Sequence, residues 1–156
     1  MIEVSIPGYK ILQLKHLVMD YNGTMACDGR LIDGVREKLE TLCHQLEIHV
    51  LTADTFGKAR SELAGVPTAL SILPEANQDQ GKLEYVRRLG ADAVVAVGNG
   101  RNDKLMLAEA GLGIALIQEE GACVETVTAA DMVCPDILSG LSLLINTGRL
   151  VAGLRR

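Results

Sequence analysis

The chain contains 156 residues, of which 48% are hydrophobic and 22% charged, and its formal net charge at pH 7 is −5. This length and composition fit a folded domain with a sizeable core and exclude a disordered chain. With no Trp, one Phe and three Tyr, the chain lacks the positive charge and stacking side chains of a nucleic-acid-binding surface. No stretch is apolar enough to span a bilayer, and no signal peptide is evident. We therefore expect neither nucleic acid nor a membrane as a partner.

The cysteine pattern bears on the compartment. Cys27, Cys43, Cys123 and Cys134 form no Cys-x-x-Cys pair. Such spacing favours free thiols over disulfides or a zinc site. A cytoplasmic location is therefore expected.

The first part of the chain alternates apolar and polar residues on both sides of Pro7-Gly8, which predicts a β-hairpin over residues 2–14. The apolar run 17–19 predicts a buried strand that ends on Asp20. After a polar, turn-rich segment at 26–31, Asp33 is the expected cap of a helix whose apolar residues recur at helical spacing.

Strands and helices then alternate to the end of the sequence. Strands are expected at 48–51, 66–73, 93–97 and 112–117, with an edge strand at 132–134; helices are expected at 55–64, 78–89, 105–110, 122–130 and 137–145. This alternation predicts a three-layer, Rossmann-like α/β fold in which helices cover both faces of a parallel sheet. Without a linker or internal repeat, residues 1–156 are expected to form a single domain whose hairpin leads into the first core strand.

Polar residues follow four successive elements of the predicted sheet: the segment 20–24 (Asp-Tyr-Asn-Gly-Thr), Thr52, Lys82 and the segment 98–103 (Gly-Asn-Gly-Arg-Asn-Asp). Ligands of open α/β sheets bind beyond the carboxyl ends of the strands, where these residues are expected to lie. Each set alone also has a plain structural explanation, since Asp, Asn, Gly and Thr are common turn residues and most lysines are solvated.

Taken together and in this order, the four sets resemble those of the haloacid dehalogenase (HAD) superfamily of phosphohydrolases and phosphotransferases. The resemblance covers residues 14–117, and its strongest parts are the segments 20–24 and 98–103. The segment 51–59 is similar to a loop in the phosphorylation domain of P-type ATPases. The nearest match is therefore a soluble relative of that domain with a HAD-like core.

The resemblance implies a role for each residue of the four sets. Asp20 would attack phosphorus and form an aspartyl-phosphate, with Mg²⁺ as the cofactor. The implied catalytic residues are Asp20, Asn22, Thr52 and Lys82. The implied phosphate-binding residues are Gly23, Thr24, Thr52, Ala53 and Lys82. The implied metal ligands are Asp20, Asn22, Asn99 and Asp103. Phosphoryl transfer depends mainly on positioning and charge compensation, which these residue types can supply.

Two positions depart from the pattern of the superfamily's phosphatases. Asn22 stands where they have an aspartate that protonates the leaving group and then activates water, and Asn99 replaces an acidic metal ligand. An amide cannot exchange protons at neutral pH, so we expect slow turnover or a persistent aspartyl-phosphate. The alternative is an inactive regulatory module that binds phosphate or metal on the same fold.

The intervals between the polar sets bear on the substrate. About thirty residues separate Thr24 from Thr52, and Thr52 from Lys82, and core elements fill both intervals, so a capless protein is expected. An open site admits a phosphoprotein, or a phosphorylated small molecule if a second subunit closes it. Closure by a second subunit would require a homo-oligomer, with residues 2–14 and 137–145 as candidate subunit contacts. Both segments could instead simply complete the core. A receiver domain phosphorylated on Asp20 is disfavoured, because receivers carry the phospho-acceptor at their third strand.

Overall fold

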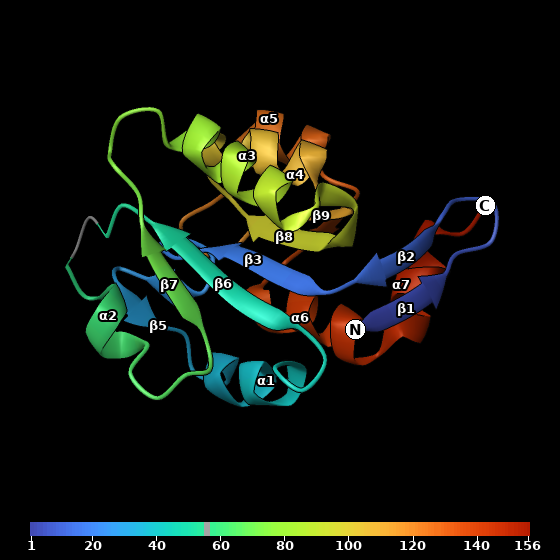
Figure 1. The fold of residues 1–156 in the computed structure, drawn as a ribbon, viewed down its shortest axis with the longest axis horizontal. Coiled ribbons are helices and arrows are strands. Elements are labelled where there is room, and N and C mark those ends of the chain that lie inside the picture. The colour runs from blue at the N-terminus through green and yellow to red at the C-terminus, as the bar shows by residue number, and fades with distance from the viewer. Residues whose placement is uncertain (55–56) are drawn as a thin grey trace.

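The structure is a computed structural model that describes residues 1–54 and 57–156. Its centre is a parallel sheet of six strands in the order β10-β9-β8-β3-β6-β7 (Figure 1). The strands are β3 (His16–Asp20), β6 (Glu47–Thr52), β7 (Ala69–Ile72), β8 (Val94–Gly98), β9 (Leu112–Leu116) and β10 (Met132–Cys134). The predicted α/β class and parallel sheet are confirmed.

Helices cover both faces of this sheet, so the predicted three layers are also confirmed. One face carries α3 (Gln78–Leu89), α4 (Lys104–Glu109) and α5 (Val124–Ala129), and the opposite face carries α1 (Val35–Leu42) and α6 (Ile137–Ile145) (Figure 1). The inner residues of β3 and all residues of β8 and β9 are apolar or Gly, because these strands are buried on both sides. Leu17 and Met19 of β3 pack into the core beneath α1 and α6, whereas Val18 packs toward α3 and α4.

An antiparallel hairpin precedes the sheet and extends the core at one end. It consists of β1 (Ile2–Ser5) and β2 (Ile11–Leu14), which lie beside α7 (Thr147–Leu154) (Figure 1). Alternate side chains of the hairpin, including Val4 and Leu12, are buried in the core that also contains Leu150 of α7. Helix α7 was not predicted from the sequence.

The segment that follows the first core strand differs from the prediction. Residues 26–31 form a small hairpin, β4 (Ala26–Cys27) with β5 (Arg30–Leu31), where only a turn was expected. Its two turn residues, Asp28 and Gly29, have φ values of 49° and 78°, which matches the tight turn that Asp-Gly favours. The prediction that Asp33 caps the next helix was wrong, because Gly34, with φ 88°, occupies the cap position and no side chain caps α1.

Two other elements differ in extent from the prediction. The strand predicted at 66–73 is limited to β7, at residues 69–72, because only these residues pair with β6. The start of the helix predicted at 55–64 lies outside the described residues, and the described part is α2 (Ala59–Glu62). A cap domain could be inserted between Thr24 and Thr52 or between Thr52 and Lys82. In both intervals the described residues form only helices and strands of the core and the small β4–β5 hairpin.

A search of the described helices for membrane spans finds no single helix of sufficient length and apolarity. Only α6 and α7 taken as a pair pass the length and composition test, and they are bent by 101° at their junction.

Candidate functional site

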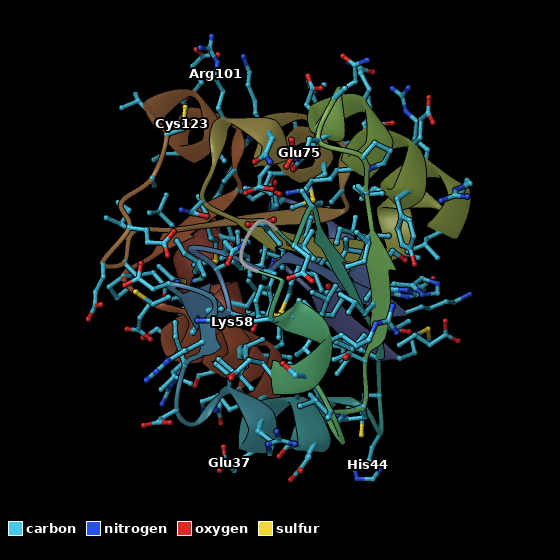
Figure 2. All side chains as sticks on the ribbon, turned by 90° about the vertical axis from the view of Figure 1, so that its left-hand side faces the viewer. Glu37, His44, Lys58, Glu75, Arg101 and Cys123 are labelled. Carbon is cyan, nitrogen blue, oxygen red and sulfur yellow. The ribbon has the colours of Figure 1, made fainter. Side chains whose placement is uncertain are left out.

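The predicted site residues meet at the edge of the sheet where β3, β6 and β8 end. Asp20 is the last residue of β3, Thr52 is the last residue of β6, and Asn99 directly follows β8. The arrowheads of β3 and β6 in Figure 1 point to this edge, and Figure 2 faces it. Parallel strands bring these ends together although 32 residues separate Asp20 from Thr52 in the sequence.

A buried lysine joins two of the strand ends. Lys82 Nζ, on the second turn of α3, lies 2.6 Å from Asp20 Oδ1 and 2.6 Å from Asp103 Oδ1. The side chains of Lys82 and Asp103 are fully buried, and that of Asp20 is 12% exposed. A buried ammonium is tolerated only when it is paired, and here it bridges two carboxylates.

The backbone after β8 is shaped to hold Asp103. Asp103 Oδ2 accepts hydrogen bonds from the N–H groups of Asn99, at 2.9 Å, and Gly100, at 2.8 Å. A Cβ at Gly98 would lie 2.5 Å from the Asp103 carboxylate, so only glycine fits there. The glycines of the segment 98–103 therefore let the chain close around a carboxylate.

Burial and charge shift the protonation equilibria of this pair. Burial, and then the negative charge of Asp103, raise the pKa of Asp20 to about 7, although Lys82 acts in the opposite direction. Burial acts to lower the pKa of Lys82, but Asp103 and Asp20 outweigh it and raise that pKa above its usual value. The lysine is therefore held as a cation, and a second positive charge near Asp20 would favour the ionised carboxylate.

Beside Asp20 lies a cavity of about 280 Å³. The predicted site residues on its wall are Asp20, Asn22, Thr52, Ala53 and Asn99, joined by Gln78, Gly100, Asn102 and Glu120. Thr52 Oγ1 accepts a hydrogen bond from Asp54 N–H at 2.9 Å, which leaves the hydroxyl proton free to donate. Among the side chains that the structure describes, Asn22 Oδ1 is buried without a hydrogen-bond partner.

Gly23 and Thr24 shape the turn after Asp20 and are not on the wall of that cavity. Gly23 N–H donates to Ala26 O at 2.8 Å, and Thr24 N–H donates to Tyr21 O at 3.3 Å. The Thr24 hydroxyl donates to Asn99 Oδ1 at 3.3 Å. The backbone groups expected to bind phosphate at these two positions are thus paired within the protein, and so is the Asn99 oxygen expected to bind the metal.

Gln118, which was not predicted as a site residue, holds the turn after Asp20 in place. Its Nε2 donates to Gly23 O at 2.8 Å and to Thr24 O at 2.6 Å, and its Oε1 accepts from Ile137 N–H at 2.9 Å. Gln118 lies two residues beyond the end of β9, so its place after a strand was the available signal.

Gln78 was also not predicted as a site residue, and on the cavity wall it accepts a hydrogen bond from Asn102 Nδ2 at 2.8 Å. No local pattern marks a glutamine at the start of a helix as a site residue. Its role depends on the packing of α3 against the segment 98–103.

The donor set fits a hard divalent cation. Asp20 offers a carboxylate oxygen on the cavity wall, and Asn22 brings a side-chain amide oxygen that is buried and unpartnered among the described residues. Both oxygens of the fully buried Asp103 are bonded within the protein, one to Lys82 and the other to backbone N–H groups. Mg²⁺ prefers oxygen ligands and retains several waters, and an open cavity beside these groups leaves room for them. The residues on the cavity wall therefore fit Mg²⁺, with the Asp20 carboxylate as the anionic group beside the cavity.

Comparison with known sequences finds relatives of part of the chain. The chain is 48% identical over 59 residues to the uncharacterized protein MJ0073 of Methanocaldococcus jannaschii, a match that spans 38% of this chain and 63% of that protein. It is also 46% identical over 39 residues to the uncharacterized protein MJ0072 of the same organism, which covers 25% of this chain and 89% of that protein. No protein-family model matches the chain.

Solved structures show where the fold belongs. The 3-deoxy-D-manno-octulosonate 8-phosphate phosphatase of Moraxella catarrhalis, solved with magnesium, phosphate and KDO, superposes with a TM-score of 0.69 at 16% identity, over 90% of this chain and 92% of that one. A hydrolase of Legionella pneumophila assigned to subfamily III A of the HAD superfamily gives a TM-score of 0.72 at 13% identity, over 91% and 87% of the two chains.

A zinc-transporting PIB-type ATPase in the E2.Pi state gives a TM-score of 0.61 at 24% identity, over 78% of this chain and 20% of the transporter. These neighbours include a HAD-superfamily protein and a P-type ATPase, the two groups that the sequence resembles. The fold of the chain is that of the haloacid dehalogenase superfamily, without a cap domain in the residues that the structure describes.

Proposed function

We propose that the chain is a Mg²⁺-dependent phosphohydrolase or phosphotransferase whose nucleophile is Asp20. The observation that carries the proposal is the buried Lys82, held 2.6 Å from both Asp20 and Asp103 beside an open cavity. A carboxylate can approach an anionic phosphate only where positive charge offsets their repulsion, and a pre-positioned cation does so without reorganisation. Structural neighbours that act on phosphorylated small molecules support the same class of reaction.

The proposed reaction has two steps. Asp20 attacks phosphorus, the bond from phosphorus to the leaving oxygen breaks, and an aspartyl-phosphate forms. Water then attacks the same phosphorus, which releases phosphate and restores the Asp20 carboxylate. The Thr52 hydroxyl and the Ala53 N–H would donate hydrogen bonds to phosphoryl oxygens, while Lys82 compensates charge on Asp20. When bound, Mg²⁺ supplies further positive charge beside the carboxylates of Asp20 and Asp103.

Asn22 limits both steps because it cannot give or take a proton. Without a general acid, the leaving group must depart as a weak base, so acyl and aryl phosphates are better donors than alkyl phosphates. Without a general base, hydrolysis of the aspartyl-phosphate is slowed by about 10²- to 10⁴-fold. The proposed enzyme is therefore slow and accumulates the phosphorylated form.

A second candidate function is a regulatory module that binds phosphate or metal without turnover. It is favoured by Asn22 and Asn99, which remove two negative charges from positions where related phosphatases carry acids, and by the engagement of Asn99 with Thr24. In that case Asp20 would be a ligand and not a nucleophile. An accumulating phosphoryl group on Asp20 separates the two functions.

The test is incubation of the full chain with acetyl phosphate and Mg²⁺, followed by intact-mass spectrometry and peptide mapping. The proposal expects a phosphoryl adduct on Asp20 that requires Mg²⁺ and is absent from Asp20→Asn. The matched control is Asp92→Asn, which changes an exposed carboxylate in the turn before β8 that does not line the cavity. An unmodified wild-type protein that still binds phosphate would establish the binding module instead.

A further inference from the structure

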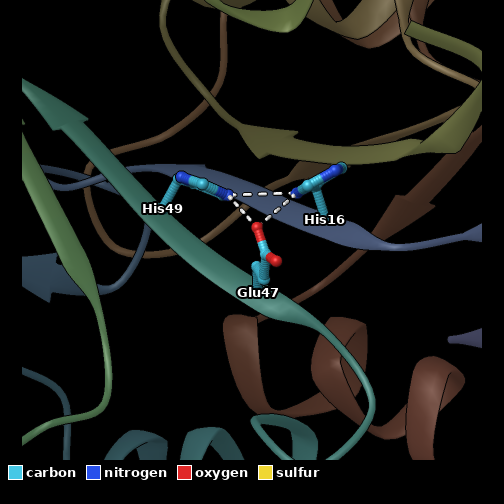
Figure 3. Close-up of side chains that lie close together, drawn as sticks. All are labelled: His16, Glu47 and His49. Carbon is cyan, nitrogen blue, oxygen red and sulfur yellow. Dashed lines mark hydrogen bonds and ion pairs between the residues drawn. The ribbon is translucent and has the colours of Figure 1, made fainter. Parts of the chain in front are cut away.

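A second cluster of metal-ligating side chains lies at the opposite edge of the same sheet. His16 begins β3, and Glu47 and His49 belong to the first half of β6 (Figure 3). His16 and Asp20 are four residues apart on one strand, so the cluster is about 13 Å from the proposed nucleophile at about 3.3 Å per residue. The three side chains are therefore separate from the site described above.

Strand pairing explains why the three side chains meet. The parallel register pairs His16 directly with Glu47, and Glu47 and His49 are two positions apart, so both project to the same face of β6. That face is covered by α3, and Tyr85 of α3 reaches His49. Figure 3 shows the two imidazole rings and the Glu47 carboxylate pointing toward a common centre.

The distances between the ligand atoms suit a tetrahedral ion. His16 Nδ1 lies 3.3 Å from His49 Nε2 and 3.2 Å from Glu47 Oε2, and His49 Nε2 lies 4.0 Å from Glu47 Oε2. Ligand atoms held 2.0 to 2.1 Å from a tetrahedral Zn²⁺ are about 3.3 to 3.4 Å apart. The Glu47 side chain is 75% exposed, so it is free to close the longer distance.

The surroundings of His49 also suit a ligand. Its side chain is 10% exposed, and its other ring nitrogen, Nδ1, lies 3.0 Å from the Tyr85 hydroxyl. Histidines that bind metals commonly donate this second N–H to a partner, which fixes the ring and leaves the other nitrogen for the ion.

We propose that His16, Glu47 and His49 form a binding site for a transition-metal ion of the Zn²⁺ class, with Tyr85 orienting His49. Two imidazoles and one carboxylate are a known donor set for zinc, with the fourth position left to water. Imidazole nitrogen selects Zn²⁺ or Co²⁺ over Mg²⁺. The bound ion links β3 to β6, the two strands whose other ends carry Asp20 and Thr52.

The proposal is tested with Co²⁺ as a visible probe. The full chain is stripped with a chelator and titrated with Co²⁺ in excess Mg²⁺, which occupies the oxygen-rich site at the other edge. We expect one Co²⁺ per chain with the visible absorption of a tetrahedral complex, and its displacement by Zn²⁺. A wild-type protein without that absorption overturns the proposal.

Variants assign the ligands. Glu47→Gln changes an exposed side chain, so it retains the fold, and it should weaken Co²⁺ binding by more than 100-fold. Tyr85→Phe removes only the orienting contact and should cost about 10-fold. The matched control is His44→Gln, because His44 is the one histidine outside the cluster and is exposed at the lower edge of Figure 2. Unchanged binding in Glu47→Gln contradicts the proposal.

A second cluster of possible metal ligands must be distinguished from the site at His16. Cys27, Asp28 and Glu120 also bring ligand atoms together, but at partly or fully exposed positions. Loss of the Co²⁺ absorption in Cys27→Ser, with Glu47→Gln behaving as wild type, would move the ion to that cluster and refute the site at His16. Loss in Glu47→Gln with Cys27→Ser unchanged supports it.

Discussion

Replacing Lys82 by methionine removes the cation that joins Asp20 to Asp103 while retaining an unbranched side chain of similar length. Both carboxylates then lack their positive partner in a site where Lys82 and Asp103 are fully buried. At an effective dielectric constant of about 20, opposite charges 2.6 Å apart attract by roughly 6 kcal/mol. Desolvation of the lysine offsets part of this attraction, and loss of one partner of a buried pair costs about 3–5 kcal/mol.

The assay is urea or thermal unfolding in chelator at pH 7.5. A loss of about 3–5 kcal/mol is a large share of the stability of an ordinary domain and lowers the melting temperature by about 6–20 °C. The matched control is Lys104→Met, because Lys104 is 41% exposed and pairs with Glu125 at the surface, and it should cost less than about 1 kcal/mol.

Two further measurements connect this loss to charge. Adding Asp103→Asn to Lys82→Met removes one of the two uncompensated carboxylates and should recover part of the stability. Added Mg²⁺ should stabilise Lys82→Met, because the ion supplies positive charge to the same two carboxylates. If Lys82→Met is no less stable than Lys104→Met, the lysine does not hold this pair of carboxylates and the electrostatic reasoning fails.

Three other outcomes are expected. Asn22→Asp should speed hydrolysis of the aspartyl-phosphate by up to about 10²- to 10⁴-fold in a phosphate-release assay, and an unchanged rate would contradict the missing proton transfer. Because the pKa of Asp20 is raised to about 7, the metal-free folded state binds more protons than the unfolded state between pH 4 and 7. The contribution of Asp20 protonation to the free energy of unfolding is therefore present below about pH 4 and is lost as the pH rises through 7. Urea titrations across that range should show this pH dependence in the wild type and not in Asp20→Asn. Gly23→Ala should cost more than about 1 kcal/mol, because φ is +75° and the added Cβ would lie 2.5 Å from Asn99 Nδ2; a melting temperature equal to that of wild type would refute this.

The sequence could predict the parts of the fold that depend on local patterns. The run 17–19 followed by Asp20, and the helical spacing of residues 78–89, set the first core strand and α3 with little error. Features that depend on pairing were less accessible. The strand predicted at 66–73 is limited to residues 69–72 because only these pair with β6. The N-cap of α1 is Gly34 at φ 88°. Neither feature followed from local propensity.

The sequence by itself determined which residue types reach the ends of the strands: Asp20, Thr52 and the segment 98–103 are each encoded by a short run in their own part of the chain. Only the tertiary structure decided that Lys82 bridges Asp20 and Asp103, and that His16 meets Glu47 and His49. The physical reason is that strand order and register bring together side chains from distant segments. A shift of one residue in register would turn them to opposite faces of the sheet.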